Sequence, residues 1–168
     1  MQIFIITPFP AIPGAIIGES ILRRAGAKEI VDYHMIDLWD FTEGKHRQID
    51  DYPFGGGTGM VMMAEPILKA MDRVRGLYNG DKGLRVVFPS PQAQVLSQET
   101  SRDLSEADGI AFICGHYKGI DERVRETVVT DEISIGDYVV TGGELPAMVI
   151  LDSVVRLISG VLGLSLIH

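Results

Sequence analysis

Apolar residues gather along this chain in two kinds of pattern, which predict strands and helices. Short continuous apolar runs, typical of buried strands, occupy residues 2–7, 30–36, 84–88, 109–114 and 138–141. Helices are predicted where apolar positions recur at helical spacing or where a capping residue opens a segment, at residues 17–27, 64–75, 98–107, 121–128 and 145–159. Because strands alternate with helices, the sequence predicts an α/β domain with a mostly parallel sheet flanked by helices.

Three of the predicted strands stop at glycine or proline. Residues 84–88 run into Pro89-Ser90-Pro91, residues 109–114 into Gly115, and residues 138–141 into Gly142-Gly143. Ligands of open α/β sheets sit beyond the carboxyl ends of the strands, and glycine lets a backbone come close to them. The pattern therefore predicts a pocket walled by main chain, with the glycine pair making room for a ligand such as a purine. The plain alternative, left open by the pattern, is that these residues only shape the turns.

A polar stretch at residues 40–59 contains three consecutive glycines, and a loop of that length is usually functional or mobile. Neither the GxGxxG dinucleotide fingerprint after the first strand nor the GxxxxGK[ST] phosphate loop occurs. These two common nucleotide sites are therefore poorly supported.

Composition and charge limit the class of protein. The chain has 168 residues, of which 46% are hydrophobic and 23% charged, as in a soluble globular domain. It has one cysteine, Cys114, which excludes an intrachain disulfide and a CxxC metal site and is expected in the core. The N-terminus lacks a signal-peptide pattern, and Asp152 and Arg156 interrupt the last apolar stretch. We therefore expect a cytoplasmic protein and no membrane partner.

The net charge of −8 argues against a broad surface for binding nucleic acid, but it is compatible with a local basic patch.

Four segments carry a resemblance to a known family. They are DDYPFGGGTGMVMM (50–63), FPSPQ (88–92), CGHYKGIDERV (114–124) and SIGDYVVTGGELPAM (134–148). Together they resemble the bacterial tRNA (guanine-N1)-methyltransferases of the SPOUT class, in order over residues 1 to about 163. The resemblance implies an α/β fold with a C-terminal deep trefoil knot, and a homodimer whose tRNA site spans both subunits. It also implies S-adenosylmethionine-dependent methylation of N1 of guanosine 37 in tRNA, 3′ of the anticodon.

The resemblance also assigns roles to residues of this sequence. Arg156 matches a catalytic arginine, and a guanidinium suits the negative charge that forms on guanine O6 when N1 loses its proton. RNA binding falls on Arg47 and on the glycine-rich loop with Gly55, Gly56, Gly57 and Gly59. The cofactor-binding positions are Phe88, Pro89, Ser90, Pro91, Gly115, Tyr117, Gly119, Ile135, Gly136, Tyr138, Val140, Gly142, Gly143 and Pro146.

The sequence departs from the family pattern in three places. The family carries its general base, an aspartate, in a linker after the final helix, followed by a tRNA-binding domain. Here residues 1–163 match the methyltransferase domain, and residues 164–168, LSLIH, match nothing in the family. We therefore expect this chain to bind cofactor and to give almost no methyl transfer. Lys118 replaces a usual glutamate, and Thr58 replaces a usual proline.

Several alternatives stay open at this stage. Another SPOUT RNA methyltransferase is the nearest, and a non-catalytic nucleotide- or RNA-binding module comes from a different class. A nicotinamide-dependent oxidoreductase would need the GxGxxG fingerprint, which is missing.

Asp137 and Glu144 are either site carboxylates or parts of a helix cap or a surface ion pair. His116 lies in a cofactor loop, but without a Cys or His partner it is weak evidence for a metal. We predict no metal site in the protein and leave participation of Mg²⁺ open.

Overall fold

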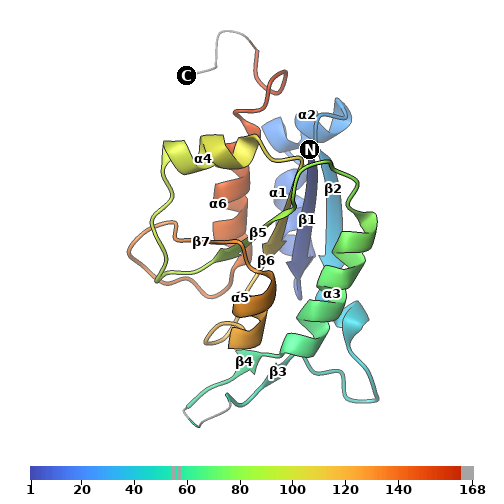
Figure 1. The fold of residues 1–168 in the computed structure, drawn as a ribbon, viewed down its shortest axis with the longest axis vertical. Coiled ribbons are helices and arrows are strands. Elements are labelled where there is room, and N and C mark those ends of the chain that lie inside the picture. The colour runs from blue at the N-terminus through green and yellow to red at the C-terminus, as the bar shows by residue number, and fades with distance from the viewer. Residues whose placement is uncertain (54–55, 57, 164–168) are drawn as a thin grey trace.

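The core of the protein is a five-stranded parallel sheet with the strand order β2-β1-β6-β5-β7 (Figure 1). The computed structural model describes residues 1–53, 56 and 58–163. The strands are β1 (Gln2–Thr7), β2 (Asp32–Asp37), β5 (Arg85–Pro89), β6 (Gly109–Ile113) and β7 (Asp131–Ile133). Every pair of neighbouring strands is parallel. The predicted mostly parallel α/β fold is confirmed.

Helices cover both faces of the sheet, which explains why its strands β1 and β6 are buried along their whole length. Ile3 and Ile5 of β1 pack into one core, with α1 (Ala11–Ile17), α2 (Ser20–Ala27), α4 (Gln98–Ser105) and α6 (Glu144–Val155) on that side. Phe4 and Ile6 point into the opposite core, beneath α3 (Ala64–Leu77), α5 (Glu122–Val128) and the short η1 (Leu38–Phe41). Burial of alternate side chains on both faces is expected for parallel strands.

The N-terminal helical region differs from the prediction. The sequence predicts one helix at residues 17–27, whereas the structure has two, α1 and α2, with Gly18 as the C-cap of α1. Prolines at positions 8, 10 and 13 interrupt the apolar periodicity that would otherwise predict α1. Pro13 lies in the first turn of α1, where its missing N–H costs no helical hydrogen bond.

The strand predicted at residues 138–141 is wrong. These residues belong to a loop, and the side chain of Val139 is 81% exposed. The edge strand is instead β7, which pairs with β5 a few residues earlier in the chain. The apolar run looked like a buried strand, but its side chains face open space beside the carboxyl edge of the sheet. The predicted polar loop at residues 40–59 begins within η1 and contains the short strand β3 (Asp50–Asp51), which forms an antiparallel hairpin with β4 (Val61–Met62).

The segment 134–143 connects the edge strand β7 to α6 and crosses the carboxyl edge of the sheet. It forms isolated bridges, Ser134 with Val95 and Gly142 with His116. The backbone N–H of Gly143 donates to the carbonyl of Gly115 at 2.8 Å. These contacts place the start of α6 next to the end of β6. Helix α6 then runs along one face of the sheet beside α1, α2 and α4 (Figure 1).

Among the described residues, no helix is long and apolar enough to cross a membrane.

Candidate functional site

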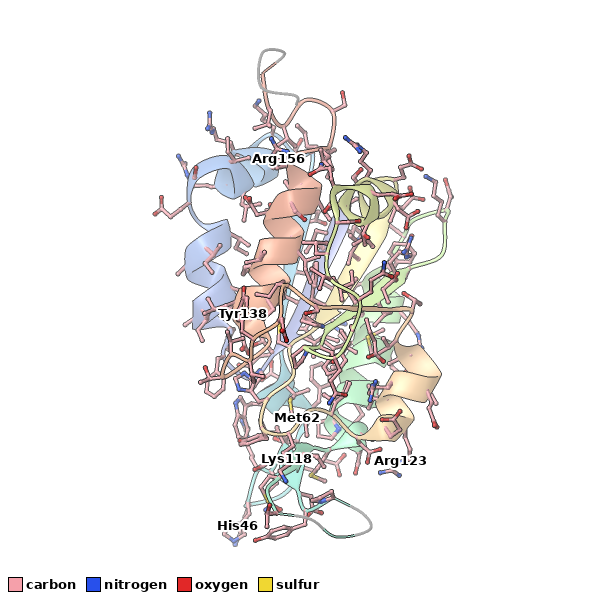
Figure 2. All side chains as sticks on the ribbon, turned by 90° about the vertical axis from the view of Figure 1, so that its left-hand side faces the viewer. His46, Met62, Lys118, Arg123, Tyr138 and Arg156 are labelled. Atoms are coloured by element: carbon pink, nitrogen blue, oxygen red, sulfur yellow. The ribbon has the colours of Figure 1, made fainter. Side chains whose placement is uncertain are left out.

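A cavity of about 410 Å³ opens at the carboxyl edge of the sheet, a size typical of small-molecule sites. Its walls come from the chain after β5, the loop after β6 and the segment 133–146. Figure 2 shows Tyr138, one of its lining residues, near the beginning of α6. Thirteen of the fourteen predicted cofactor positions line this cavity: Phe88, Pro89, Ser90, Pro91, Gly115, Tyr117, Gly119, Ile135, Tyr138, Val140, Gly142, Gly143 and Pro146.

Gly136, the fourteenth predicted position, is not a lining residue. Its φ of 152° lies in a region that side chains rarely adopt, and its N–H donates to the hydroxyl of Ser134 at 3.1 Å. The Ser134 hydroxyl in turn donates to the Gly136 carbonyl at 2.9 Å. Gly136 therefore shapes the turn that brings the following residues to the cavity.

The loop after β6 also holds an unusual backbone. Tyr117 has a φ of 60°, uncommon for a residue with a side chain, and Gly119 has a φ of 123°. The Lys118 N–H donates to the Met60 carbonyl at 3.1 Å, and the Met62 N–H donates to the Gly119 carbonyl at 3.0 Å. Partial burial and the neighbouring Asp50 raise the pKa of Tyr117. The cavity loop is thus attached to the β3–β4 hairpin that carries the glycine-rich loop.

The glycine pair Gly142-Gly143 makes room mainly for the protein itself. A Cβ on Gly143 would lie 2.7 Å from the backbone nitrogen of Gly115 and 2.9 Å from the Cα of Cys114. A Cβ on Gly142 would lie 2.7 Å from Oε2 of Glu144. Both glycines line the cavity, yet the expectation that their missing side chains leave space for a ligand is wrong. The space is filled by the ring of His116 and the carboxylate of Glu144 beside Gly142, and by the backbone of Cys114 and Gly115 beside Gly143.

A buried hydrogen-bond network lies behind this glycine pair. Glu144 is 2% exposed, and its Oε1 accepts a hydrogen bond from the Thr7 hydroxyl at 2.6 Å. Nε2 of His116 lies 2.8 Å from Oε1 and 2.6 Å from Oε2 of the same carboxylate. Gly143, not Glu144, is the N-cap of α6. Glu144 is therefore neither a helix cap nor a surface ion pair, and Asp137 is exposed outside the cavity lining.

Cys114 is completely buried at the end of β6. Burial, and then the charge of Glu144, raise the pKa of the Cys114 thiol well above its ordinary value. The thiol stays protonated at neutral pH and has no access to a substrate, so the prediction that Cys114 is a core residue is confirmed.

Cationic side chains, and no carboxylates, line the cavity among the described residues. Lys118 is exposed, and its Nζ lies 3.4 Å from the Thr58 hydroxyl (Figure 2). Arg125 lies on α5 and binds Glu132 through Nε at 2.9 Å and through Nη2 at 2.8 Å. Arg125 was not among the predicted site residues, because it falls within a helix, outside the loops marked by glycine and proline. Among the described residues there is no group of three His, Cys, Asp or Glu that would hold a metal ion.

Arg156 does not reach this cavity within one chain. It is the C-cap of α6, whereas Gly143 and Pro146 of the cavity lie at the beginning of that helix. At 1.5 Å per residue, the twelve residues of α6 separate the two ends by about 18 Å. Figure 2 shows Arg156 and Tyr138 at opposite ends of the helix.

Three of the predicted RNA-binding residues, Arg47, Gly56 and Gly59, lie at the other end of the molecule from Arg156. Arg47 is exposed in the loop before β3, next to His46 at the lower tip in Figure 2. Gly56 and Gly59 have φ values of 83° and 103°, which glycine adopts readily. The predicted positions Gly55 and Gly57 lie outside the described residues.

Comparison with known proteins decides the family. The model of the tRNA (guanine-1)-methyltransferases, TrmD, matches residues 1–167. The chain belongs to this tRNA (guanine-1)-methyltransferase family. Family members from Staphylococcus carnosus and Geobacillus kaustophilus, both named tRNA (guanine-N(1)-)-methyltransferase, are 52% and 48% identical to it over 163 residues. These matches cover 97% of this chain and 65% and 66% of the two relatives, so the chain spans about two thirds of their length.

A solved structure of the same family confirms the fold. The tRNA (m1G37) methyltransferase of Aquifex aeolicus is 37% identical and superposes with a TM-score of 0.87. The match covers 97% of this chain and 72% of the Aquifex chain. The parallel sheet and its helices are therefore those of the tRNA (guanine-1)-methyltransferase fold.

Proposed function

We propose that this chain binds S-adenosylmethionine in the cavity at the carboxyl edge of the sheet. We further propose that it forms the methyltransferase domain, residues 1–163, of an enzyme that methylates N1 of guanosine 37 in tRNA. The observation that carries the proposal is the meeting of thirteen predicted cofactor positions, from three separate segments, in one cavity. The names of the relatives and the m1G37 activity in the name of the Aquifex enzyme support the choice of substrate.

The cavity suits a purine nucleoside with an amino-acid tail. Its volume of about 410 Å³ lies in the range of small-ligand sites, and its walls combine apolar side chains such as Ile135 and Val140 with glycine backbone. Backbone N–H and C=O groups exposed at glycines would hydrogen-bond the edges of a purine. When bound, S-adenosylmethionine supplies a methyl group already activated on its sulfonium, so the protein has mainly to position and polarise.

Methylation of guanine N1 requires removal of its proton, which places negative charge on O6. A guanidinium stabilises such charge with fixed donors, and we propose this role for Arg156. A proton acceptor is also needed, and no carboxylate lines the cavity among the described residues. The family resemblance assigns that role to an aspartate in the linker after α6.

A homodimer reconciles the position of Arg156 with this role. Arg156 lies about 15 Å along α6 from Pro146 of its own cavity, so we propose that it serves the cavity of a second copy. The side of α1 and α6 carries exposed apolar residues, which we call the α1–α6 face: Phe9 46%, Ile12 40%, Leu145 54% and Val149 48% exposed. Such an apolar surface is typical of a protein interface, and a second copy of this chain is the occupant we propose.

The remaining parts of the proposal follow from the tRNA substrate. We expect contacts with tRNA in and beside the glycine-rich loop, at Arg47, Gly56 and Gly59, next to the loop after β6 that holds Lys118.

The segment 134–143 crosses over the sheet, which is consistent with the threading of the family's trefoil knot, and we include the knot in the proposal. A tRNA substrate also implies a cytoplasmic protein. We assign no protein ligands to Mg²⁺, and transfer assays with and without a chelator measure whether the ion takes part.

Methyl transfer to tRNA transcripts tests this function. The assay compares a transcript bearing guanosine 37 with one bearing adenosine 37, using this chain and the same chain extended by a family-type linker and C-terminal domain. We expect the extended protein to methylate only the guanosine transcript, and this chain alone to show almost no transfer. Equal methylation of both transcripts would assign the enzyme to another RNA position.

A further inference from the structure

The carboxylate of Glu144 is buried, and both of its oxygens have hydrogen-bond partners. The Thr7 hydroxyl donates to Oε1 at 2.6 Å, and the Phe9 N–H donates to the oxygen of that hydroxyl at 2.9 Å. The single Thr7 hydroxyl proton is therefore directed at Glu144, while the Thr7 oxygen accepts from Phe9. A buried carboxylate with a fixed donor on one side is a rigid acceptor for whatever lies on its other side.

His116 lies on that other side, and the carboxylate determines which of its nitrogens carries a proton. Nε2 is 2.8 Å from Oε1 and 2.6 Å from Oε2, and an ionised carboxylate only accepts hydrogen bonds. Nε2 therefore carries the hydrogen. In a neutral imidazole the other nitrogen, Nδ1, is then an acceptor, as in sites where a carboxylate orients a functional histidine.

Nδ1 of His116 is available to a ligand. Within the described part of the chain no hydrogen bond to Nδ1 is formed, and no buried side-chain nitrogen or oxygen there lacks a partner. Nδ1 must therefore reach open space, and His116 lines the cavity. The ring is held from two more sides: Phe9 packs edge-on with a centroid distance of 4.9 Å, and the His116 backbone N–H lies 3.0 Å from Sδ of Met62.

We propose that His116 contacts the cavity ligand by accepting an N–H hydrogen bond at Nδ1. Glu144 and Thr7 are the positioning residues that hold the ring in the required tautomer. The matching group on S-adenosylmethionine is an amine, either the adenine amino group or the ammonium of the amino-acid tail. This inference rests on the proposed function for the identity of the ligand, and it adds a contact that the family resemblance does not assign.

The tautomer is measured directly by long-range ¹H–¹⁵N correlation NMR of the four histidines. We expect His116 to show a protonated Nε2 and an unprotonated Nδ1 in the free protein. Saturating S-adenosylmethionine should then shift the Nδ1 resonance. His34 provides an internal reference, because its Nε2 lies 2.7 Å from Asp32, on β2 and outside the cavity.

The substitution Glu144→Gln separates positioning from folding. The amide keeps the shape, removes the buried charge and still accepts from Thr7, but its N–H₂ would donate to Nε2 of His116. His116 would then carry its proton on Nδ1 and present a donor to the ligand. We expect the NMR spectrum to show this exchange of tautomer, with S-adenosylmethionine binding weakened about tenfold in calorimetry. The matched control, Asp32→Asn beside His34, should leave the affinity unchanged.

Each outcome bears on one of the two proposals. A wild-type His116 with its proton on Nδ1 would overturn the inference. So would a normal heat of S-adenosylmethionine binding with an unmoved Nδ1 resonance, or undiminished affinity in Glu144→Gln after the tautomer has changed. No heat with S-adenosylmethionine, in a protein that has the expected free tautomer, would instead contradict the proposed function. Thr7→Ser, which keeps the hydroxyl, should behave like the wild type, and Thr7→Val should not.

Discussion

Gly143 lies in direct backbone contact with Gly115. Its N–H donates to the Gly115 carbonyl at 2.8 Å, and a Cβ at position 143 would stand 2.7 Å from the Gly115 nitrogen. The N-cap of α6 therefore packs directly against the backbone that follows β6, with no side chain between them. Because both residues line the cavity, the shape of the cavity depends on this backbone contact.

Alanine at Gly143 is predicted to separate the two loops. No flexible side chain can move away from the new Cβ, since the atoms it meets are backbone. Overpacking of this kind costs about 1–3 kcal/mol. We expect Gly143→Ala to lower the free energy of unfolding by that amount in urea titrations and to weaken S-adenosylmethionine binding at least about tenfold.

The matched control is Gly76→Ala. Gly76 lies in α3, and a Cβ there would have no heavy atom within 4 Å. Alanine is the better helix former, so this variant should gain about 0.5–1 kcal/mol of stability and keep its ligand affinity. Equal losses in the two variants would mean that the Gly143 contact has no special role.

Lys118 is predicted to weaken binding of a cationic ligand. S-adenosylmethionine carries a positive sulfonium, and the cavity is lined by Lys118 and Arg125 and by no described carboxylate. We expect Lys118→Glu to tighten S-adenosylmethionine binding about two- to tenfold at low salt, and less at high salt, because Lys118 is exposed.

S-adenosylhomocysteine, which lacks the sulfonium charge, serves as the matched ligand for this test. Its affinity should change less than that of S-adenosylmethionine in Lys118→Glu, and Lys118→Gln should fall between the two charged forms. Parallel changes for both ligands would show that position 118 does not act through the sulfonium charge.

The ion pair between Arg85 and Asp131 is predicted to give a pH-dependent part of the stability. Burial works to raise the pKa of Asp131, but hydrogen bonds from Arg85 and Thr130 outweigh it and hold the pKa below the ordinary 3.8. Nε of Arg85 donates to Asp131 at 2.9 Å, which ties β5 to the edge strand β7. A depressed pKa means that the unfolded state binds the proton more readily, so the contribution is present above about pH 4 and disappears as the pH falls through the folded pKa.

Urea unfolding of Arg85→Met against wild type measures this contribution. We expect a loss of about 1–2 kcal/mol at neutral pH, since the pair is partly exposed, and a much smaller difference at about pH 2–3. A difference that stays constant on acidification would assign the loss to packing of the arginine stem. Lys69→Met, which breaks exposed pairs with Glu43 and Glu65, should cost far less at any pH.

Substitution of Val149 by aspartate is predicted to break the proposed dimer. Val149 is 48% exposed on the α1–α6 face, so a charge there is tolerated in the monomer but not between two apolar surfaces. Sedimentation should show a monomer for Val149→Asp, while Tyr52→Asp, at a 73% exposed site outside this face, stays dimeric. Dimerisation that survives Val149→Asp would place the interface elsewhere.

Much of the sheet follows from local patterns. The residues of β1 are apolar at every position that contacts one of the two cores, and residues 2–7 were predicted with the observed bounds. Ser97, directly before the predicted helix at residues 98–107, accepts a hydrogen bond from the Thr100 N–H at 3.1 Å and is the N-cap of α4. Strand burial and helix capping of this kind depend on residues close in the sequence, so the sequence pattern predicts them.

The site depends on contacts between distant segments, which no local pattern contains. Tyr138 and Val139 have the composition of a strand, and only the position of β7 at the sheet edge leaves them exposed in a loop. The partners of Glu144 come from positions 7 and 116, so its burial was not predictable from the residues around it. The distance between Arg156 and the cavity likewise appears only once the direction of α6 is known.

Titration calorimetry of this chain with S-adenosylmethionine, and with NAD as the competing nucleotide, is the most direct test of the proposed site. The account predicts a saturable heat with S-adenosylmethionine at one site per chain, its marked reduction in Gly143→Ala, and no heat with NAD. Heat with NAD alone, or S-adenosylmethionine binding that Gly143→Ala leaves intact, would contradict it.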